Sequence, residues 1–100
     1  MPKPEKQQFD ELILSKTRLG IISALIGGDK LDFTYLRDVL NLSDGNLSVQ
    51  IRKLEDAGYI KVEKKFVDRK PKTFCTITSK GQKALLNLIS KLENLVNTES

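Results

Sequence analysis

The chain has 100 residues, of which 39% are hydrophobic and 30% charged, proportions typical of one small folded domain. Its net charge of +4 is compatible with a polyanionic partner, although many proteins this basic bind none. The single Cys excludes an internal disulfide, and the absence of His removes the commonest metal ligand and general base.

The beginning of the chain predicts an arm rather than part of the core. Residues 1–8 are polar, contain prolines, and are expected to fray. The following stretch looks helical, because Phe9, Leu12 and Ile13 fall on one face of a helix. We expect residues 1–14 to pack as an arm on the body or on a partner subunit.

A first core helix is predicted over residues 16–26. Ser15 is placed to cap it, and Gly27-Gly28 is placed to end it. Its buried side chains are expected to follow helical spacing, as Leu19, Ile22, Leu25 and Ile26.

A very short strand over residues 31–33 and a second helix over residues 35–40 come next. Thr34 is expected to cap this helix and Asn41 to end it. Its inward side chains are expected to be Leu36, Val39 and Leu40. Another helix starts almost immediately afterwards, and this tight connection is what a helix–turn–helix motif requires.

The third helix is predicted to begin after the N-cap Ser43 and to stop at Gly58, which takes the left-handed conformation easily. Leu47, Ile51 and Leu54 recur at helical spacing and form its core-facing stripe.

The opposite face of this helix has an unusual order of residue types. It begins with small or amide side chains, carries one apolar residue, and continues into two cations. A helix in a DNA groove needs such residues, because Asn can pair with adenine, Arg with guanine, and an apolar side chain with a thymine methyl. A surface helix without a partner is the alternative, and the helix alone does not decide between them. The positions on this face are Gly45, Asn46, Val49, Arg52, Lys53 and Asp56.

After Gly58 the pattern changes to that of a β-hairpin. Residues 59–67 begin by alternating apolar and polar side chains, and residues 73–78 are rich in β-branched and aromatic ones. Asp68-Arg69-Lys70-Pro71 between them is typical of a turn with a basic tip. We expect the cations of this hairpin to contact phosphate or a minor groove, and the alternative is a solubilising sheet edge. These cations are Lys61, Lys64, Lys65, Arg69, Lys70 and Lys72.

A long final helix is predicted from Ser79 to about Asn97, with Thr78 as its cap. Its apolar residues cover a wide arc, which favours a dimer seam over packing on its own small domain. The homodimer interface is expected to comprise Phe9, Leu12, Ile13, Leu85, Leu88, Ile89, Leu92, Leu95 and Val96.

Enzymes and metal sensors need constellations that the sequence lacks. It has no paired Cys, no Gly-rich phosphate loop and no recognisable nucleophile–base pair, so we expect no catalysis, no cofactor and no metal. Cys75 lies in a predicted strand, where burial is favoured over a reactive thiol. The sequence shows no signal-peptide pattern and no long apolar run, so we expect a cytoplasmic protein without a membrane partner.

In order and spacing, several stretches resemble the winged-helix transcriptional regulators of the MarR/ArsR type, particularly the small single-domain bacterial and archaeal ones. The matching stretches are residues 17–22, 31–36, 42–48, 54–60, 68–73 and 77–81, and the resemblance covers about residues 15 to 96. It implies a dimeric DNA-binding regulator, and it identifies neither an operator nor an effector.

The expected fold is α+β and mostly α, a winged helix-turn-helix with a three-helix core and a β-hairpin wing. The N-terminal helical arm of residues 1–14 precedes the DNA-binding domain of residues 15–78, and residues 79–100 form a long dimerisation helix. We expect sequence-specific binding to double-stranded DNA as a homodimer, with residues 43–57 in the major groove and residues 60–77 on backbone or minor groove. The expected DNA contacts are Ser43, Gly45, Asn46, Ser48, Val49, Arg52, Lys53, Lys65, Arg69, Lys70 and Lys72.

The alternative function is a winged-helix protein–protein interaction module that does not bind DNA. A contiguous basic face separates the two hypotheses, because only the DNA-binding protein needs the cations of Arg52 and Lys53 to line up with those of the wing tip.

Overall fold

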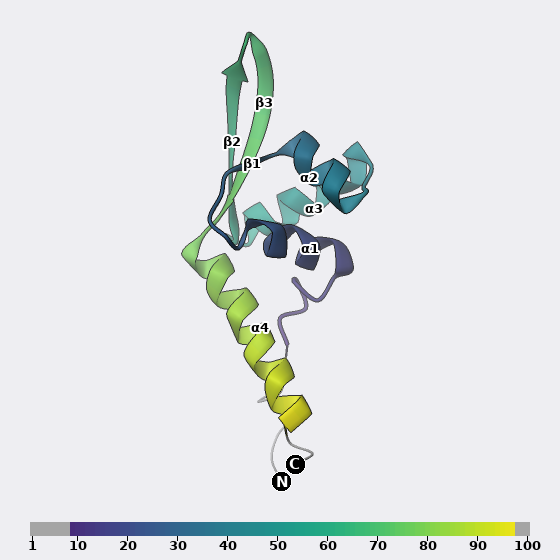
Figure 1. The fold of residues 1–100 in the computed structure, drawn as a ribbon, viewed down its shortest axis with the longest axis vertical. Coiled ribbons are helices and arrows are strands. Elements are labelled where there is room, and N and C mark those ends of the chain that lie inside the picture. The colour runs from purple at the N-terminus through teal and green to yellow at the C-terminus, as the bar shows by residue number, and fades with distance from the viewer. Residues whose placement is uncertain (1–8, 98–100) are drawn as a thin grey trace.

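The computed structural model describes residues 9–97, which form four α-helices and a three-stranded antiparallel sheet (Figure 1). The segment expected to fray, residues 1–8, lies outside the described residues. The elements are α1 (Lys16–Leu25), β1 (Leu31–Asp32), α2 (Phe33–Leu40), α3 (Asp44–Asp56), β2 (Ile60–Val67), β3 (Lys70–Ile77) and α4 (Ser79–Asn97). The expected winged helix-turn-helix fold is therefore confirmed.

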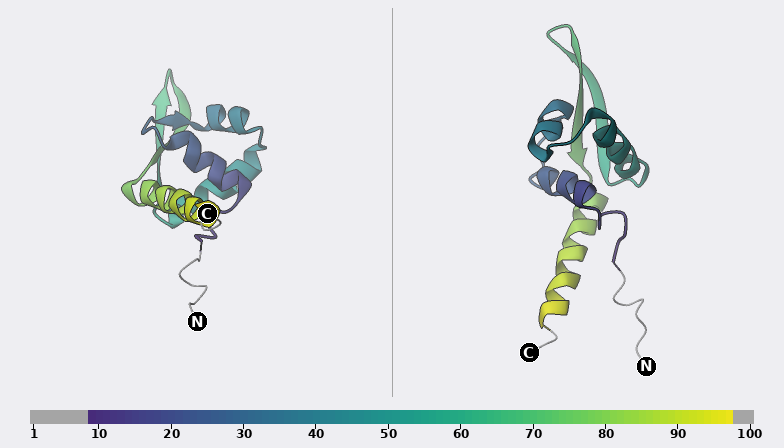
Figure 2. Two further views of the ribbon diagram at one scale, coloured as in Figure 1. Left: turned by 60° about the horizontal axis from the view of Figure 1, so that its bottom comes forward. Right: turned by 90° about the vertical axis from the view of Figure 1, so that its right-hand side faces the viewer.

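The helices α1, α2 and α3 gather beside the base of the hairpin formed by β2 and β3. The rest of the hairpin projects from one end of this body, and α4 projects from the other (Figure 1; Figure 2, right). One apolar core joins them, and burying each large side chain in it contributes about 1.5–3 kcal/mol. The fully buried side chains are Ile13, Ile21, Ile22, Leu25, Leu36, Leu47, Leu54 and Cys75.

The helix α1 begins as predicted and ends one residue early. The Ser15 hydroxyl oxygen accepts from the backbone N–H of Arg18, which caps the helix. Ile26 was expected to be buried, but it is the C-cap and is 37% exposed. Ile21 takes its place in the core, because Ile21, Ile22 and Leu25 share the face that meets the other helices.

The helix α2 is capped by Asp32 and not by Thr34, so the prediction was wrong here. Asp32 has the extended backbone that an N-cap needs, and its carboxylate accepts from the backbone N–H of Tyr35 at 3.2 Å. Val39 was expected to point inward but is 54% exposed, since this short helix buries only the side of Leu36.

The N-terminal segment is also different from the prediction. Residues 11–13 form a turn instead of a helix. The carboxylate of Asp10 accepts from the backbone N–H of Leu12 at 3.0 Å, and this local bond competes with helix formation.

The ends of the helix α3 follow the prediction closely. The Ser43 hydroxyl oxygen accepts from the backbone N–H of Asn46 at 3.1 Å. Gly58 follows the C-cap with φ +82°, a conformation that glycine adopts without a Cβ clash. The backbone N–H of Tyr59 then donates to the carbonyl of Leu54 at 2.9 Å, which closes the helix end and turns the chain into β2.

The hairpin has a tighter tip than the four residues predicted. Strand β3 begins at Lys70, and Val67 pairs directly with it, so Asp68 and Arg69 alone make the turn. Both have positive φ, 52° and 68°, as two-residue hairpin turns of the primed type require. Pro71 belongs to the strand, in the part beyond β1, where proline is tolerated.

The start of α4 is fixed against the end of α3. The Thr78 hydroxyl accepts from the backbone N–H of Gly81 at 3.0 Å and donates to the carbonyl of Gly58 at 2.6 Å. Gly81 is needed for close approach, because a Cβ there would stand 2.2 Å from the carbonyl oxygen of Tyr59. The predicted cap Thr78 is therefore confirmed, and the helix runs to Asn97.

Candidate nucleic-acid interface

The outer face of α3 is exposed at the positions that the sequence predicted. Leu47, Ile51 and Leu54 are buried in the core, so the opposite side of the helix points outward. Val49 is 52% exposed although it is apolar, which leaves it available for contact with another molecule. The other exposed positions on this side are Ser43, Gly45, Asn46, Ser48, Arg52 and Lys53.

The N-terminal end of α3 carries a carboxylate that is neutralised by α2. Asp44 lies in the first turn, where the helix dipole favours a negative charge. Arg37 of α2 donates from Nη1 to Oδ1 of Asp44 at 2.9 Å and from Nε to Oδ1 of Asp38 at 3.1 Å. The pair therefore offsets negative charge at the exposed N-terminal end of α3.

A groove of about 230 Å³ separates α3 from the hairpin. Arg52 of α3 and Lys64 of β2 both line it, so the two cations lie at one surface. The sequence placed Lys64 in the basic cluster of the hairpin, but only its neighbour Lys65 was named among the expected DNA contacts. The remaining lining side chains are Phe33, Ser48, Ile51, Glu55, Val62 and Thr73.

The strand register divides the hairpin cations between two faces. Side chains alternate along a strand, so Lys64 and Phe66 share the face that meets the groove beside α3. The other face carries Lys65, with its cross-strand partner Lys72. Arg69 occupies the turn itself, so the tip presents a cation between the two faces.

The Lys65 side has its own charge network. Lys30, which precedes β1, forms an ion pair with Glu63 at 3.0 Å, and the hydrogen bond from Lys30 lowers the pKa of Glu63. The same Lys30 side chain lowers the pKa of Lys65, because two ammonium groups lie together. Among the hairpin cations, Lys65 therefore stands in an already crowded cationic environment.

Phe66 is the most exposed large apolar residue in the part of the chain that the structure describes, at 78%. It lies opposite Pro71 near the tip, among Lys64, Lys65 and Arg69. Sequence reasoning noted Phe66 as part of a strand and did not assign it to the interface. Its signal in the sequence is an aromatic residue within a strongly basic hairpin, a combination found in nucleic-acid-binding surfaces.

Gln50 is a further residue that nothing in the sequence assigned to the site. It is half-buried between α1 and α3, and its side chain hydrogen-bonds both Arg18 and Asn46. It therefore connects the core side of α3 with a residue of the exposed face. Residue type alone gives no signal for this contact, because Arg18 is distant in the sequence.

The residues expected at a dimer interface fall into two groups. Ile13, Leu85 and Leu88 are buried in the core of their own chain, and Phe9 and Leu12 are half-buried against it. The exposed group lies in the half of α4 that extends beyond the body (Figure 1). It comprises Ile89, Leu92, Leu95 and Val96, which are 43%, 45%, 43% and 73% exposed.

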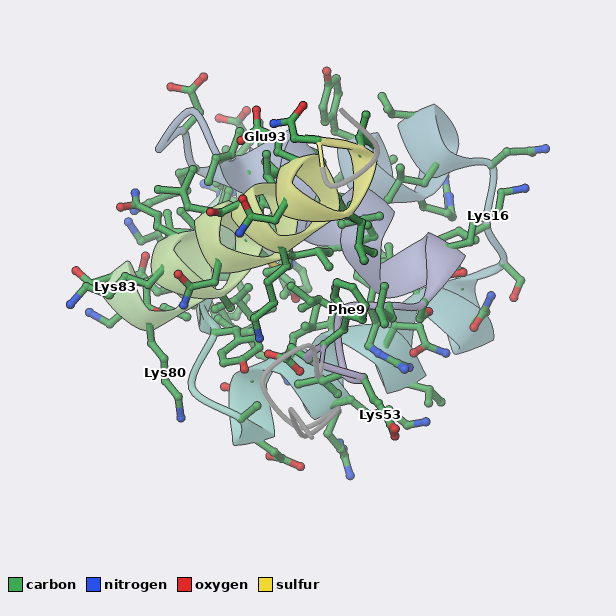
Figure 3. All side chains as sticks on the ribbon, turned by 90° about the horizontal axis from the view of Figure 1, so that it is seen from below. Phe9, Lys16, Lys53, Lys80, Lys83 and Glu93 are labelled. Carbon is green, nitrogen blue, oxygen red and sulfur yellow. The ribbon has the colours of Figure 1, made fainter. Side chains whose placement is uncertain are left out.

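A second cavity, of about 240 Å³, lies where the N-terminal segment meets α4. The Tyr59 hydroxyl donates to the carboxylate of Asp10, and desolvation together with Asp10 raises the pKa of Tyr59 to about 12. The ammonium of Lys80 stands 5.6 Å from the centre of the Tyr59 ring. Seen from below, Phe9 lies on one side of α4 and Glu93 on the other (Figure 3).

Cys75 is fully buried, as the sequence predicted. Desolvation by burial, with a smaller effect of Glu55, raises the pKa of its thiol to about 11. Since the thiolate is the reactive form, this environment favours a structural role.

Two further findings concern residues 9–97 as a set. No group of three or more His, Cys, Asp or Glu side chains among them is arranged to hold a metal ion. None of their helices is both long and apolar enough to cross a membrane.

The chain is similar to known proteins both in sequence and in structure. The sequence model of the winged helix DNA-binding domain family matches residues 17–96. An uncharacterized protein of Methanocaldococcus jannaschii is 37% identical over 81 residues, which are 81% of this chain and 88% of that protein.

Two solved structures extend this likeness. A transcriptional regulator homologue from Pyrococcus horikoshii OT3 is 30% identical, with a TM-score of 0.85 over 96% of this chain and 95% of that one. The transcriptional regulator BldR from Sulfolobus solfataricus is 26% identical, with a TM-score of 0.69 over 85% of this chain and 60% of that one. The expected resemblance to winged-helix transcriptional regulators is confirmed by these similarities.

Proposed function

The chain belongs to the winged helix DNA-binding domain family, and from that premise we propose that it regulates transcription as a homodimer bound to specific double-stranded DNA sequences. The helix α3 enters the major groove with its exposed face, and the hairpin acts as the wing on backbone or minor groove. The observation that carries this proposal is the shared groove lined by Arg52 and Lys64.

Each proposed contact has a distinct chemical role. Asn46, Val49 and Arg52 contact base edges, and Ser43 and Ser48 contact phosphate or base edges near them. Lys53 contacts phosphate. The Ser43 oxygen accepts from the helix, so its hydroxyl hydrogen remains to donate to a phosphate. Gly45 has nothing within 4 Å of a Cβ position, so the backbone can approach DNA there.

The wing adds charge and an apolar side chain. Arg69 reaches phosphate or the minor groove from the tip, and Lys65, Lys70 and Lys72 contact phosphate from the face that carries them. We add Lys64 and Phe66 to the proposed DNA contacts of the wing, since both side chains lie on the face of the hairpin that meets the groove. An exposed aromatic ring among cations suits the sugars of a minor-groove wall or a widened base step.

Dimerisation supplies the spacing that a symmetric site requires. The exposed apolar side chains Ile89, Leu92 and Val96 line a groove of about 350 Å³ on α4, together with Glu93 and Asn97. Pairing this face in two copies places the recognition helices about 34 Å apart, one turn of B-DNA. We therefore propose residues 79–100 as the dimerisation region and residues 15–78 as the DNA-binding region.

Selection of bound duplexes from a random pool tests the proposal directly. The expected result is a pseudo-palindromic site, with affinity that falls as the salt concentration rises. The protein-interaction alternative predicts no enrichment of any sequence and no retention on a DNA column at low salt. Either of these negative results would overturn the DNA-binding proposal.

A further inference from the structure

A chain of hydrogen bonds runs from α1 through Gln50 to the exposed face of α3. Nη1 of Arg18 donates to Oε1 of Gln50 at 2.5 Å, and Nε2 of Gln50 donates to Oδ1 of Asn46 at 3.0 Å. Arg18 is held in turn, because its Nε donates to the backbone carbonyl of Leu12 at 2.5 Å. We call Arg18, Gln50 and Asn46 the amide relay.

The chemistry of Arg18 fixes the direction of the amide relay. A guanidinium group has donors and no acceptor, so Gln50 has to turn its carbonyl oxygen toward Arg18. The amide nitrogen of Gln50 then faces Asn46 and needs an acceptor there. Asn46 meets it with Oδ1, and its own amide nitrogen points away from Gln50.

A flip of the side-chain amide of Asn46 would break its hydrogen bond with Gln50. Turning the amide over would place its NH₂ group against the NH₂ group of Gln50, with two donors facing each other and no acceptor between them. An isolated Asn on a helix surface can present either its NH₂ group or its carbonyl oxygen to another molecule. The relay fixes Asn46 so that its NH₂ group is the one presented.

We propose that Gln50 and Arg18 are positioning residues that make Asn46 contact DNA as a hydrogen-bond donor, so that it selects a base with an acceptor in the major groove. This inference rests on the proposed function. The acceptors available there are O6 and N7 of guanine, N7 of adenine and O4 of thymine, whereas N4 of cytosine and N6 of adenine are donors. Asn46 is exposed near the start of α3, the part of a recognition helix that contacts base edges.

Gln50→Glu tests the direction of the relay. The substitution replaces the amide nitrogen by a second oxygen, so position 50 still accepts from Arg18 and can no longer donate to Asn46. Asn46 then has to turn its nitrogen toward position 50 and its oxygen toward DNA. Selection of bound duplexes should show that the preference at one position in each half-site shifts from guanine or thymine, which present acceptors only, toward cytosine, which presents a donor, by roughly tenfold in relative affinity.

Lys53→Gln is the matched control for charge. It lowers the net charge by the same one unit on the same helix, outside the amide relay. It should weaken binding to all sequences and leave the base preference unchanged. Asn46→Ala should lose the preference at the position that Gln50→Glu reverses, which identifies that base as the one read by Asn46.

Gln50→Leu provides a second variant of similar size, and thermal unfolding of each variant checks that the fold is kept. Without a donor at position 50, Asn46 is free to rotate and the preference at its base should relax instead of reversing. The relay is overturned if the wild type selects a sequence while both Gln50 variants keep its preference at every position. A wild type that selects no sequence would instead overturn the proposed function.

Discussion

Arg37 on α2 and Asp44 on α3 form an ion pair across the helix–turn–helix connection, with 2.9 Å between Nη1 and Oδ1. The connection itself is set by Asn41, whose backbone is left-handed with φ 56° and ψ 53°. The pair thus holds a cation beside Asp44, the only acidic residue in the first turn of α3. In the proposed complex its effect is electrostatic, because Asp44 at the start of α3 would repel DNA phosphates.

Arg37→Ala should weaken DNA binding and change the melting temperature little. The pair is largely exposed, so its loss has a small effect on folding, while Asp44 without its partner repels phosphate. Fluorescence anisotropy with a labelled duplex measures the affinity. The double variant with Asp44→Ala should recover most of the loss, and a double variant as weak as Arg37→Ala would contradict this role for the pair.

Gly81→Ala should destabilise the fold. A Cβ at this position would stand 2.2 Å from the carbonyl oxygen of Tyr59 and 2.9 Å from Cγ1 of Ile77, so backbone or core has to shift. Overpacking of this kind costs about 1–3 kcal/mol. Gly27→Ala is the control, since nothing lies within 4 Å of its Cβ position. Chemical denaturation followed by circular dichroism compares them, and equal stabilities would refute the close approach.

Arg69→Gly separates the charge of the wing tip from its backbone conformation. Arg69 has φ 68°, which costs a non-glycine residue roughly 1–2 kcal/mol, so Gly should stabilise the hairpin while removing a cation. Binding to all sequences should weaken, and the slope of log K against log salt should flatten by about 0.9 for the lost phosphate contact. Lys83→Ala, on α4 and away from the hairpin, should leave the slope unchanged.

Leu92→Glu should convert the dimer to a monomer. Leu92 is 45% exposed and belongs to the apolar groove on α4, so a carboxylate there would be buried against the second copy. Leu86→Glu is the control, because Leu86 is more exposed, at 58%, and does not line this groove. Sedimentation velocity at micromolar concentration measures both. A dimeric Leu92→Glu variant would place the interface elsewhere.

Local signals account for the elements that the sequence predicted correctly. The N-caps Ser15, Ser43 and Thr78 were predicted because a hydroxyl precedes each apolar pattern, and all three accept backbone N–H groups. The core stripe of α3 follows from spacing alone. Glycine at position 58 marked the change from helix to strand, and its positive φ explains why.

Several errors arose where local sequence signals allow two outcomes and a contact elsewhere decides between them. Asp32 and Thr34 can both cap a helix, and the pairing of β1 with β3 decides in favour of Asp32 by giving it an extended backbone. Asp10 makes a local hydrogen bond that stops the N-terminal segment from continuing as a helix. These outcomes depend on contacts that single-sequence patterns do not contain.

The candidate site shows the same division. Arg52 and Val49 could be assigned from the helix alone, because exposure follows from the position of the core stripe. Gln50 could not be assigned in this way, since its role depends on a contact with α1. The hairpin register decides which of the basic residues, Lys64, shares the groove with Arg52. The sequence therefore predicts which face of α3 is exposed, and the tertiary structure shows which other side chains lie beside that face.

Arg52→Ala should remove base discrimination without disturbing the fold. Arg52 is exposed on the side of α3 opposite the core and lines the groove shared with Lys64, so its side chain is free to pair with guanine through two hydrogen bonds. One such pair is worth about 1–3 kcal/mol of discrimination, so the preference at one base pair of each half-site should relax accordingly. Lys64→Ala, which removes a cation from the same groove, should weaken binding to all sequences alike, because the proposed contact of Lys64 is to phosphate. Binding-site selection on the three proteins decides between the roles. If Arg52→Ala returns the wild-type preference at every position, Arg52 contacts backbone and the reading of guanine belongs to another side chain of α3.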